Sequence, residues 1–299
     1  MGVENTPMHW KSGSAPVAVV MISLNECHNM EAILQNLKGW AHEVFLVDSY
    51  SRDNTLDIAL RHGVHVVQRR FRGFGDQWNF AMQELPITAP WTMKLDPDER
   101  LTVDLKENLE AAMKRNNADG FSMERRLWLM GCALPVRQQL VRVWRTGKCH
   151  FTDVSVNEHP ILEGTIELVS GDMEHHDSPD LEHWLEKQNR YTTAEAISAY
   201  NRSPLADTPH LIGSVLQRRM WFKQYFHHLP FRYSLLFLYH WLWLGAWRAG
   251  WVGYAWAKLR SDVMRFREYK LREMELTGRS PMPRHYGPGQ PDVRVRQYE

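Results

Sequence analysis

Short apolar runs, each followed by polar residues, recur through the first hundred residues of the chain. The run Val17–Leu24 is continuous and rich in β-branched residues, which is typical of a strand buried on both faces of a parallel sheet. Further strands are predicted at 43–47, 64–68 and 91–95. Between the strands, apolar residues recur at helical spacing, as in 30–37. This alternation predicts an α/β fold in which helices cover a parallel sheet.

The pattern changes after residue 100. A helix is predicted at 103–115, and another at 180–200. Between them, strands are predicted at 120–126, 140–145 and 166–169, which would complete a mixed sheet. Arg142 and Arg145 lie on the second of these strands, where alternating arginines favour a solvent-facing side over contact with a diphosphate.

The last third of the chain is unusually aromatic. The chain contains 13 Trp, and five of them lie between residues 231 and 256. The best apolar stretch, Tyr233–Trp247, is shorter than the roughly 20 residues that a membrane-spanning helix needs. Trp and Tyr flanked by Arg and Lys are typical of the membrane interface, so we expect residues 231–256 to lie on a membrane surface. The alternatives are a packed helical appendage or a surface through which the chain forms a homo-oligomer.

Charge and cysteine content narrow the class of protein. A net charge of +1 gives no reason to expect nucleic acid as a partner. The three cysteines have no CxxC spacing, which argues against a zinc site or a disulfide framework and suits a reducing compartment. Residues 1–16 contain no apolar segment of the kind found in secretory signals. We therefore expect a cytoplasmic protein.

The most distinctive chemistry follows the strand at 91–95, in the sequence WTMKLDPDERL. Asp96, Asp98 and Glu99 place three carboxylates within four residues, and these repel one another unless a cation or a hydrogen-bonding partner holds them. Pro97 prevents the strand from continuing. This turn is expected to hold Mg²⁺ or Mn²⁺ against a diphosphate. The alternative is a solvated acidic turn at the start of a helix.

Polar residues also follow the first two strands. Asn25 and Glu26 come after the first strand and Asp48 ends the second, and ligands of such sheets bind beyond the carboxyl ends of the strands. Because no GxGxxG follows the first strand and no GxxxxGK[ST] occurs, a dinucleotide site is weakly supported and a P-loop is excluded. A nucleotide held by carboxylates and a metal remains. Asp53 is expected to cap the helix that follows Asp48.

The ordered set SLNE (23–26), VDSYSRDNT (47–55), QWNFA (77–81) and LDPDE (95–99) resembles the family-2 glycosyltransferases of the GT-A fold. Over residues 16–276 the chain resembles the bacterial lipopolysaccharide inner-core β-glucosyltransferase group. The resemblance implies inverting transfer from a nucleotide-diphospho-sugar, with a UDP-sugar as first candidate. The implied acceptor is a saccharide or lipid-linked saccharide of the cell envelope, at the inner face of the cytoplasmic membrane.

The residue pattern and the resemblance together predict a domain plan. A flexible N-terminus (1–15) precedes a GT-A nucleotide-diphospho-sugar domain with a mixed, Rossmann-like sheet (16–205). A helical, aromatic-rich extension (206–276) would associate with the membrane surface. The tail (277–299) is rich in Pro, Gly and Arg and is expected to be disordered.

The resemblance assigns donor and metal roles to particular residues. Asn25 and Glu26 would border the nucleotide pocket, and Asp48 would contact the base. Asp96 and Asp98 would form the D-x-D pair and bind the metal, with Asp98 favoured as the direct ligand and Asp96 nearer the ribose and diphosphate. The metal would act as a Lewis acid toward the leaving nucleoside diphosphate.

Two further donor-binding candidates, Asn79 and Lys94, carry weaker support. The alternative for Lys94 is a solvated residue at the end of its strand.

The segment VNEHP (156–160) offers a general base. Inverting transfer needs one group to take the proton of the acceptor hydroxyl, unlike hydrolysis, which needs two flanking carboxyls. The resembling group has a His-Glu element here, whereas this chain has Glu158 followed by His159. We favour Glu158, and His159 is the alternative.

The segment GDMEHHD (171–177) offers a further metal ligand. His175 and His176 are adjacent, so on a strand they point to opposite faces and at most one serves a single metal. The resemblance favours His176, which precedes a helix start at Leu181 and Trp184. The alternative is a structural histidine.

Two other functions are alternatives for a fold of this kind. A nucleotidyltransferase needs a glycine-rich, basic triphosphate loop near the N-terminus, and SLNECHNM (23–30) supplies neither feature. A non-catalytic, membrane-associated scaffold with the same fold predicts that substitution of Asp98 and Glu158 is silent.

Overall fold

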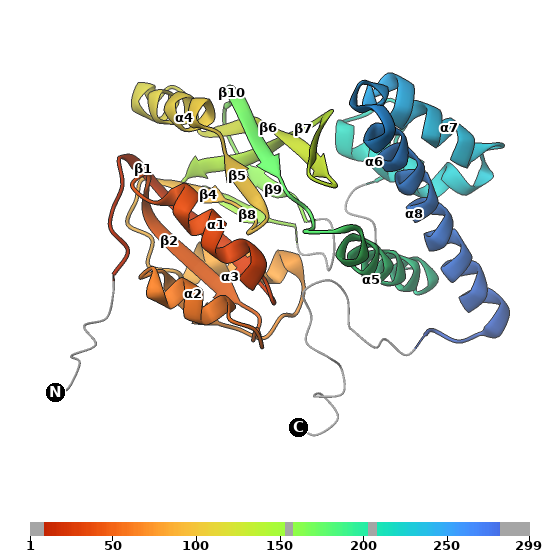
Figure 1. Ribbon diagram of the computed structural model, residues 1–299, viewed down its shortest axis with the longest axis horizontal. Coiled ribbons are helices and arrows are strands. Elements are labelled where there is room, and N and C mark those ends of the chain that lie inside the picture. The colour runs from red at the N-terminus through yellow and green to blue at the C-terminus, as the bar shows by residue number, and fades with distance from the viewer. Residues whose placement is uncertain (1–8, 153–157, 203–207, 282–299) are drawn as a thin grey trace. The chain divides into compact units, whose positions relative to one another are not determined.

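The computed structural model describes residues 9–152, 158–202 and 208–281 and divides the chain into two compact units (Figure 1). The first unit comprises the residues up to 127 together with 137–177. The second comprises 128–136 together with the residues from 178 onward. The division falls after Asp177, whereas the predicted domain boundary follows residue 205. Residues 181–200 fall in the second unit because they form a helix that packs along the long helix 250–277.

The first unit is built on an eight-stranded sheet with the order β3-β2-β1-β4-β7-β6-β10-β5. Its strands are β1 (Ala15–Ser23), β2 (Ala41–Asp48), β3 (His65–Gln68), β4 (Trp91–Lys94), β5 (Glu99–Leu101), β6 (Gly120–Leu129), β7 (Cys132–Arg145) and β10 (Ile166–His175). Strands β3, β2, β1 and β4 are parallel, while β7 runs antiparallel to β4 and β5 runs antiparallel to β10. The sheet is therefore mixed, as predicted. Strands β8 (Cys149–Phe151) and β9 (Pro160–Leu162) form a separate antiparallel pair.

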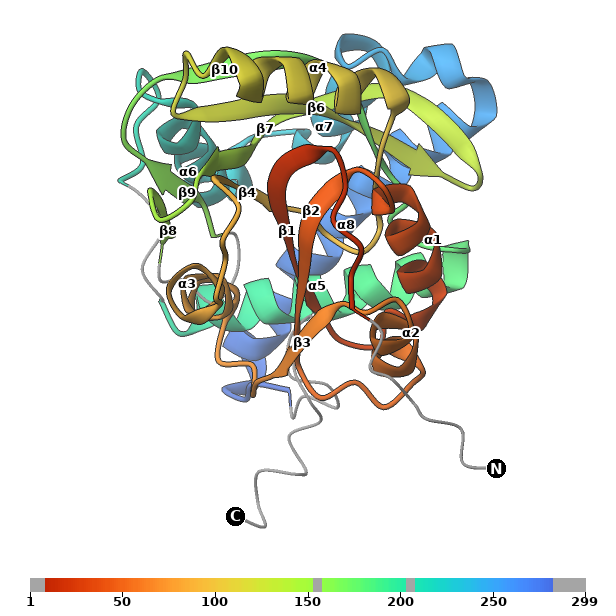
Figure 2. The same ribbon diagram turned by 90° about the vertical axis from the view of Figure 1, so that its left-hand side faces the viewer.

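Helices cover both faces of this sheet. They are α1 (Cys27–Leu37), α2 (Thr55–Arg61), α3 (Phe74–Glu84) and α4 (Val103–Arg115). In Figure 2, α1 and α2 lie on one side of β1–β3 and α3 lies on the other. The side chains of β1 alternate accordingly: Val17, Val19 and Met21 join the core under α1, whereas Ala18 and Val20 join the core under α3. Burial on both faces explains why this strand is a continuous apolar run.

The predicted elements of the first unit are confirmed, and several are longer than expected. The strand predicted at 166–169 extends to His175, and the strand at 140–145 begins at Cys132. The short strands β5, β8 and β9 were not predicted. The predicted cap of α2 was wrong in detail, because Asn54 is the N-cap residue; the carboxylate of Asp53 accepts a hydrogen bond from the backbone N–H of Thr55 at 3.0 Å.

The second unit is helical over the residues that the structure describes from 178 onward. Its helices are α5 (Leu181–Tyr200), α6 (Val215–Tyr225), α7 (Arg232–Leu238) and α8 (Gly250–Thr277), with short turns η1 (Phe226–His228), η2 (Tyr239–Trp243) and η3 (Ala246–Ala249). Among the described helices, none combines the length and the apolar character that crossing a bilayer requires.

Polar contacts join α7 to α8 inside this unit. Arg232 Nη2 lies 2.6 Å from Glu268 Oε2, and the hydroxyl of Tyr233 donates to the same oxygen at 2.5 Å. Burial and the neighbouring Glu268 carboxylate together raise the pKa of Tyr233 to about 12. The imidazole of His240 is buried edge-on against Trp256, with ring centroids 5.1 Å apart.

His240 is expected to make the second unit sensitive to acid. Burial, reinforced by the positive charge of Arg260, lowers the pKa of His240 to about 4, whereas a histidine in an unfolded chain titrates near 6.5. The unfolded state therefore binds the proton first, and the free energy of unfolding falls by about 2 kcal/mol between pH 7 and pH 4.5. Urea unfolding of wild type and His240→Phe at both pH values tests this, with the exposed His228 replaced by Phe as control. An equal loss of stability in wild type and His240→Phe would contradict it.

Candidate functional site

The polar strand ends of the first unit meet at one edge of the sheet. The parallel register places Ser23 of β1 beside Asp48 of β2, and the Ser23 hydroxyl donates to Asp48 Oδ1 at 2.9 Å. Strand β4 pairs with the other side of β1, which brings Lys94 and the acidic turn that follows it to the same edge. The predicted gathering of these residues beyond the carboxyl ends of the strands is therefore observed.

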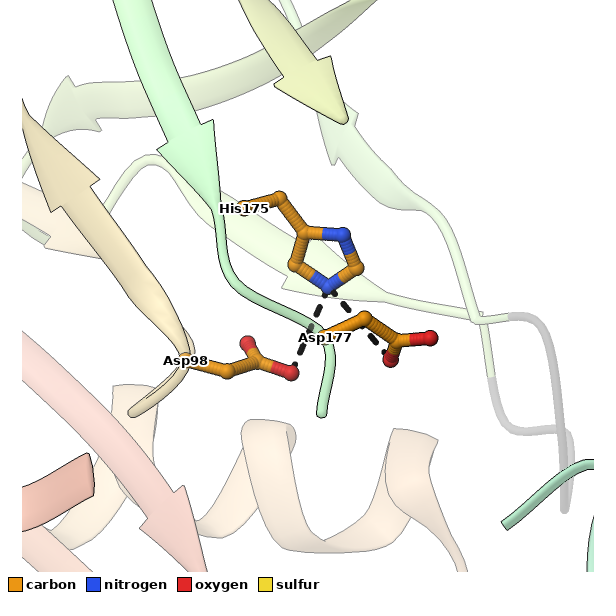
Figure 3. Close-up of side chains that lie close together, drawn as sticks. All are labelled: Asp98, His175 and Asp177. Atoms are coloured by element: carbon orange, nitrogen blue, oxygen red, sulfur yellow. Dashed lines mark ion pairs between the residues drawn. The ribbon is translucent and has the colours of Figure 1, made fainter. Parts of the chain in front are cut away.

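Three side chains converge at the acidic turn (Figure 3). His175 Nε2 lies 3.3 Å from Asp98 Oδ2 and 3.8 Å from Asp177 Oδ1. One ligand atom from each residue lies within 4.8 Å of the other two. The side chains of Asp98, His175 and Asp177 are only 9%, 14% and 17% exposed. We call Asp98, His175 and Asp177 the acidic cluster.

Backbone pairing positions the acidic cluster. Strand β10 runs antiparallel to β5, with His175 opposite Glu99, and the backbone N–H of His176 donates to the carbonyl of Asp98 at 2.8 Å. Arg100 closes the turn from the other side, because its guanidinium donates to the carbonyl of Pro97 at 2.6 Å. The acidic turn and the end of β10 are thus held together by main-chain bonds that do not depend on the cluster side chains.

The donor atoms of the acidic cluster suit a hard or borderline divalent cation. Two carboxylates and one imidazole provide oxygen and nitrogen ligands of the kinds found around Mn²⁺, while Mg²⁺ prefers oxygen alone. The three atoms already lie close enough together to face one ion, and they come from segments fixed by the sheet. The residues present therefore fit a bound divalent metal.

The structure brings a different histidine to the acidic cluster from the one that was predicted. His176 does not join the acidic cluster, because its Nε2 lies 3.4 Å from Glu174 Oε2 instead. Neighbouring residues of an extended strand point to opposite sides, and the register of β10 gives the inward position to His175. Asp177 was not among the predicted site residues.

Asp96 lies beside a buried arginine, outside the acidic cluster. Arg142 Nη2 lies 3.0 Å from Asp96 Oδ2 and 2.5 Å from Glu99 Oε1, and Glu99 also accepts from the backbone N–H of Asp96 at 3.0 Å. Arg142 is only 5% exposed, so its predicted solvent-facing position is wrong. The assignment of Asp96 as a metal ligand is not supported by its place next to Arg142.

The charges of Asp96 and Arg142 stabilise each other. Burial disfavours both charged forms, but Arg142 and Lys94 outweigh it for Asp96 and hold the pKa of that carboxyl below its usual range. Glu99 and Asp96 likewise outweigh burial for Arg142 and raise the pKa of its guanidinium. Asp96 is therefore a carboxylate that a buried cation holds in place.

Glu158 and Lys94, the last residue of β4, form an ion pair. Lys94 Nζ lies 2.5 Å from Glu158 Oε1, and the two side chains are 9% and 12% exposed. The ammonium also lies 4.4 Å from the ring centroid of Trp78 and 5.3 Å from that of Phe151. The alternative of a solvated Lys94 is therefore wrong. Residues 156 and 157 of the predicted base segment lie outside the described residues.

Two predicted donor residues form local hydrogen bonds at the rim. Asn25 adopts a left-handed backbone conformation with φ of 57°, and its Oδ1 accepts from the backbone N–H of Arg52 at 2.9 Å. The backbone N–H of Glu26 donates to Thr55 Oγ1 at 2.9 Å. These bonds hold the loop after β1 against the loop after β2, so Asn25 and Glu26 lie at the edge where a donor would bind.

The predicted donor residues Asp48 and Asn79 form hydrogen bonds deeper inside the protein. Asp48 is fully buried, and its carboxylate accepts from the Ser51 backbone N–H at 2.8 Å. The amide of Asn79 is used twice by the backbone of Phe151: Oδ1 accepts at 2.7 Å and Nδ2 donates at 3.0 Å. Asn79 therefore anchors β8, which does not support its predicted role in donor binding. The base contact of Asp48 stays a prediction.

A cavity of about 610 Å³ lies between α5 and α8 in the second unit. Its lining is largely apolar and includes Trp184, Leu259 and Phe266. Lys270 lies at its wall and donates to Asn189 Oδ1 at 2.6 Å, joining the two helices. The cavity contains none of the cluster residues, so it is separate from the carboxylates of the first unit.

The mixed sheet with helices on both faces, and the D-x-D turn at the carboxyl edge of its strands, give the first unit a GT-A-like fold. Residues 18–164 match the model of glycosyl transferase family 2. Over this segment, which is just under half of the chain, the chain is similar to that family.

Several known proteins are similar to the chain. An uncharacterised glycosyltransferase of Rickettsia bellii is 31% identical over 105 residues, which are 35% of this chain and 35% of that protein. The lipopolysaccharide core biosynthesis glycosyltransferase LpsC of Rhizobium meliloti is 28% identical over 194 residues, 60% of this chain and 70% of LpsC. The solved structure of S. aureus TarS 1–349 with UDP-GlcNAc covers 88% of this chain and 92% of its own, at 14% identity and a TM-score of 0.40. The match thus spans about a third of the length of the Rickettsia protein.

Proposed function

We propose that the protein is an inverting, metal-dependent glycosyltransferase. It would move a sugar from a nucleotide-diphospho-sugar, with a UDP-sugar as first candidate, to a saccharide or lipid-linked acceptor of the cell envelope. The observation that carries this proposal is the acidic cluster at the carboxyl edge of a family 2 sheet. Similarity to LpsC, named for lipopolysaccharide core biosynthesis, supports that class of acceptor.

Each group at the edge has a distinct task in this proposal. Asp98, His175 and Asp177 hold Mn²⁺ or Mg²⁺, which when bound acts as a Lewis acid toward the leaving diphosphate. Asp96, fixed as a carboxylate by Arg142, orients the ribose of the donor. Glu158 accepts the proton of the acceptor hydroxyl. The acceptor oxygen displaces the diphosphate at the anomeric carbon in a single in-line step, so the transfer inverts the configuration of the sugar.

The nucleotidyltransferase alternative is less well supported. That reaction needs backbone N–H groups near the N-terminus that are open to a triphosphate. Here the backbone N–H of Asn25 donates to Ser51 Oγ at 2.8 Å and that of Glu26 to Thr55 Oγ1 at 2.9 Å. Both groups are used within the protein.

A transfer assay tests the proposed activity. The purified protein is incubated with radiolabelled UDP-, GDP-, CMP- and dTDP-sugars, each with Mn²⁺ and a lipid-linked saccharide acceptor fraction from a bacterial envelope. We expect label to enter the acceptor with one nucleotide class and not with EDTA present. Binding of a nucleotide-sugar without transfer to any acceptor would favour the non-catalytic scaffold.

We further propose that the second unit binds the cytoplasmic face of a membrane through an exposed aromatic surface. This surface consists of Phe231, Leu235, Leu238, Tyr239, Leu242, Trp243, Trp247, Trp251 and Tyr254. Trp243 and Trp251 are its most exposed tryptophans, at 82% and 69%. Exposed Trp and Tyr of this density, next to basic residues such as Arg248, suit the interface between lipid and water. Such a position would present a lipid-linked acceptor to the enzyme.

Replacing Trp243 and Trp251 together by Ser should weaken binding to vesicles containing anionic lipid by about tenfold or more. Burying a large apolar side chain is worth about 1.5–3 kcal/mol, and about 1.4 kcal/mol corresponds to a tenfold change in affinity. Vesicle co-sedimentation measures the change. The matched control is Tyr269→Ser, which removes a 60% exposed aromatic ring from the charged part of α8. If the double variant sediments as the wild type does, the aromatic surface is not the membrane contact.

A further inference from the structure

We propose that Lys94 is a positioning residue that fixes the orientation of Glu158, and that it does not bind the donor. This inference rests on the proposed function, in which Glu158 accepts the acceptor proton. It concerns a residue for which the resemblance implied donor binding.

The fold directs Lys94 away from the acidic cluster. Lys94 is the last residue of β4 and pairs with Val20 of β1, whose side chain belongs to the core under α3. The ammonium of Lys94 consequently lies over the faces of Trp78 and Phe151, at 4.4 and 5.3 Å from their ring centroids. A buried lysine needs a partner for its charge, and the aromatic faces supply only part of it. Glu158 Oε1, at 2.5 Å, supplies the rest.

A donor-binding role would break this arrangement. To reach a diphosphate, Lys94 would have to leave Glu158, which is only 12% exposed, without its cation. Removing one partner of a buried ion pair is strongly destabilising because the other charge remains uncompensated. On the side of the acidic turn, the direct ion-pair partner of Asp96 is the buried guanidinium of Arg142, at 3.0 Å. Lys94 is therefore better placed to serve Glu158 than the donor.

Residues of α3 and β8 form the surroundings of the Lys94 ammonium. Asn79 on α3 forms two hydrogen bonds with the backbone of Phe151, at 2.7 and 3.0 Å. These bonds hold the main chain of Phe151, and the ring of Phe151 stacks with Trp78 at 5.6 Å between centroids. The ammonium of Lys94 lies over the faces of these two rings. Contacts with α3 and β8 thus surround the ammonium of Lys94 where it meets the carboxylate of Glu158.

The pair leaves one carboxylate oxygen for chemistry. Lys94 binds Oε1, and among the described residues Oε2 of Glu158 has no hydrogen-bond partner. In the transfer step, the proton of the acceptor hydroxyl passes to Oε2 while the hydroxyl oxygen forms a bond to the anomeric carbon. The bond from that carbon to the phosphate oxygen breaks, and its electron pair leaves with the diphosphate. Lys94 takes no part in the proton transfer and holds Glu158 in place.

Steady-state kinetics of Lys94 variants separates positioning from donor binding. We expect Lys94→Met to lower kcat for sugar transfer by about tenfold to a hundredfold, the loss expected from misplacing a reacting group by about 1 Å. The Kd for UDP with Mn²⁺ and the donor KM should stay within about twofold of wild type. Lys94→Arg, which keeps a cation, should recover part of kcat. In a Glu158→Gln background, Lys94→Met should cause no further loss of kcat.

Other outcomes overturn the inference. A large rise in donor KM or in the Kd for UDP at unchanged kcat would make Lys94 a donor-binding residue. An unchanged kcat in Lys94→Met would remove any role in the reaction. Should Lys94→Met fail to fold, as judged by its melting curve, Lys94→Arg carries the same comparison of kcat with donor KM. Failure of the proposed function is distinct, because wild type itself would then transfer no sugar.

Discussion

Asp98→Asn is expected to abolish metal-dependent binding of the nucleotide donor, with at least a hundredfold rise in the Kd for UDP in the presence of Mn²⁺. Asp98 is the most buried carboxylate of the acidic cluster, and its Oδ2 lies nearest to His175. The substitution removes one negative charge and a strong oxygen ligand while keeping the size of the side chain. Hydrogen bonds of the main chain, such as that from His176 to the Asp98 carbonyl, remain. The fold should therefore persist.

Calorimetric titration of UDP with Mn²⁺ measures this effect. The control is Asp104→Asn, which removes an exposed carboxylate from the first turn of α4 and should leave the Kd for UDP unchanged. His175→Ala and His176→Ala provide a second comparison, because the cluster geometry predicts a loss of metal-dependent binding only for His175. Wild-type affinity in Asp98→Asn would rule out the acidic cluster as the metal site.

Glu158→Gln is expected to bind the donor as the wild type does and to lose turnover. Glutamine has nearly the shape of glutamate but no basic carboxylate, so the proton of the acceptor hydroxyl has no acceptor. Loss of a general base typically costs about 10²–10⁴ in rate. We therefore expect kcat to fall by at least about a hundredfold while the Kd for UDP with Mn²⁺ changes little.

Two further variants serve as controls for Glu158→Gln. Glu163→Gln changes an exposed glutamate in the turn after β9 and should be silent. His159→Asn tests the alternative base. Should Glu158→Gln retain turnover while His159→Asn loses it, the base would be His159. Should both variants turn over at the wild-type rate, the proton would leave by another route.

The alternation of strands and helices in the first hundred residues was predictable because each element there is specified by its own periodicity. Strand β1 is a continuous apolar run because both of its faces are buried. The apolar residues at 30–37 face one core, and α4 begins and ends at the predicted residues. The gathering of Asp48 and the D-x-D turn at one edge follows from parallel strand order alone.

The identity of the histidine in the acidic cluster was not predictable in this way. It depends on the antiparallel pairing of β10 with β5, a three-residue strand that joins segments far apart in the sequence. A shift of one residue in that register exchanges His175 and His176. Asp177 enters the cluster for the same reason, because the position of the chain beyond β10 is fixed only once the strand is paired.

The burial of charged side chains was the second feature that could not be predicted from the local sequence pattern. Arg142 and Arg145 were interpreted as marking a solvent-facing side of β7, yet Arg142 is buried beside Glu99. Lys94 and Glu158 are 64 positions apart and meet only in the folded protein. Isolated motifs indicate which residue types are present, whereas ion pairs depend on how distant segments pack.

Thermal unfolding of the wild-type protein with nucleotide-sugars tests metal-dependent donor binding most directly. The protein is melted with UDP-, GDP-, CMP- or dTDP-sugars, each in the presence of Mn²⁺, Mg²⁺ or EDTA. A ligand that binds only the folded state raises Tm, by several degrees when it is present at about 100 times its Kd. We expect a rise in Tm with one nucleotide class, and only when a divalent metal is present. An equal rise with EDTA, or no rise with any donor, would contradict a metal-dependent donor site at Asp98, His175 and Asp177.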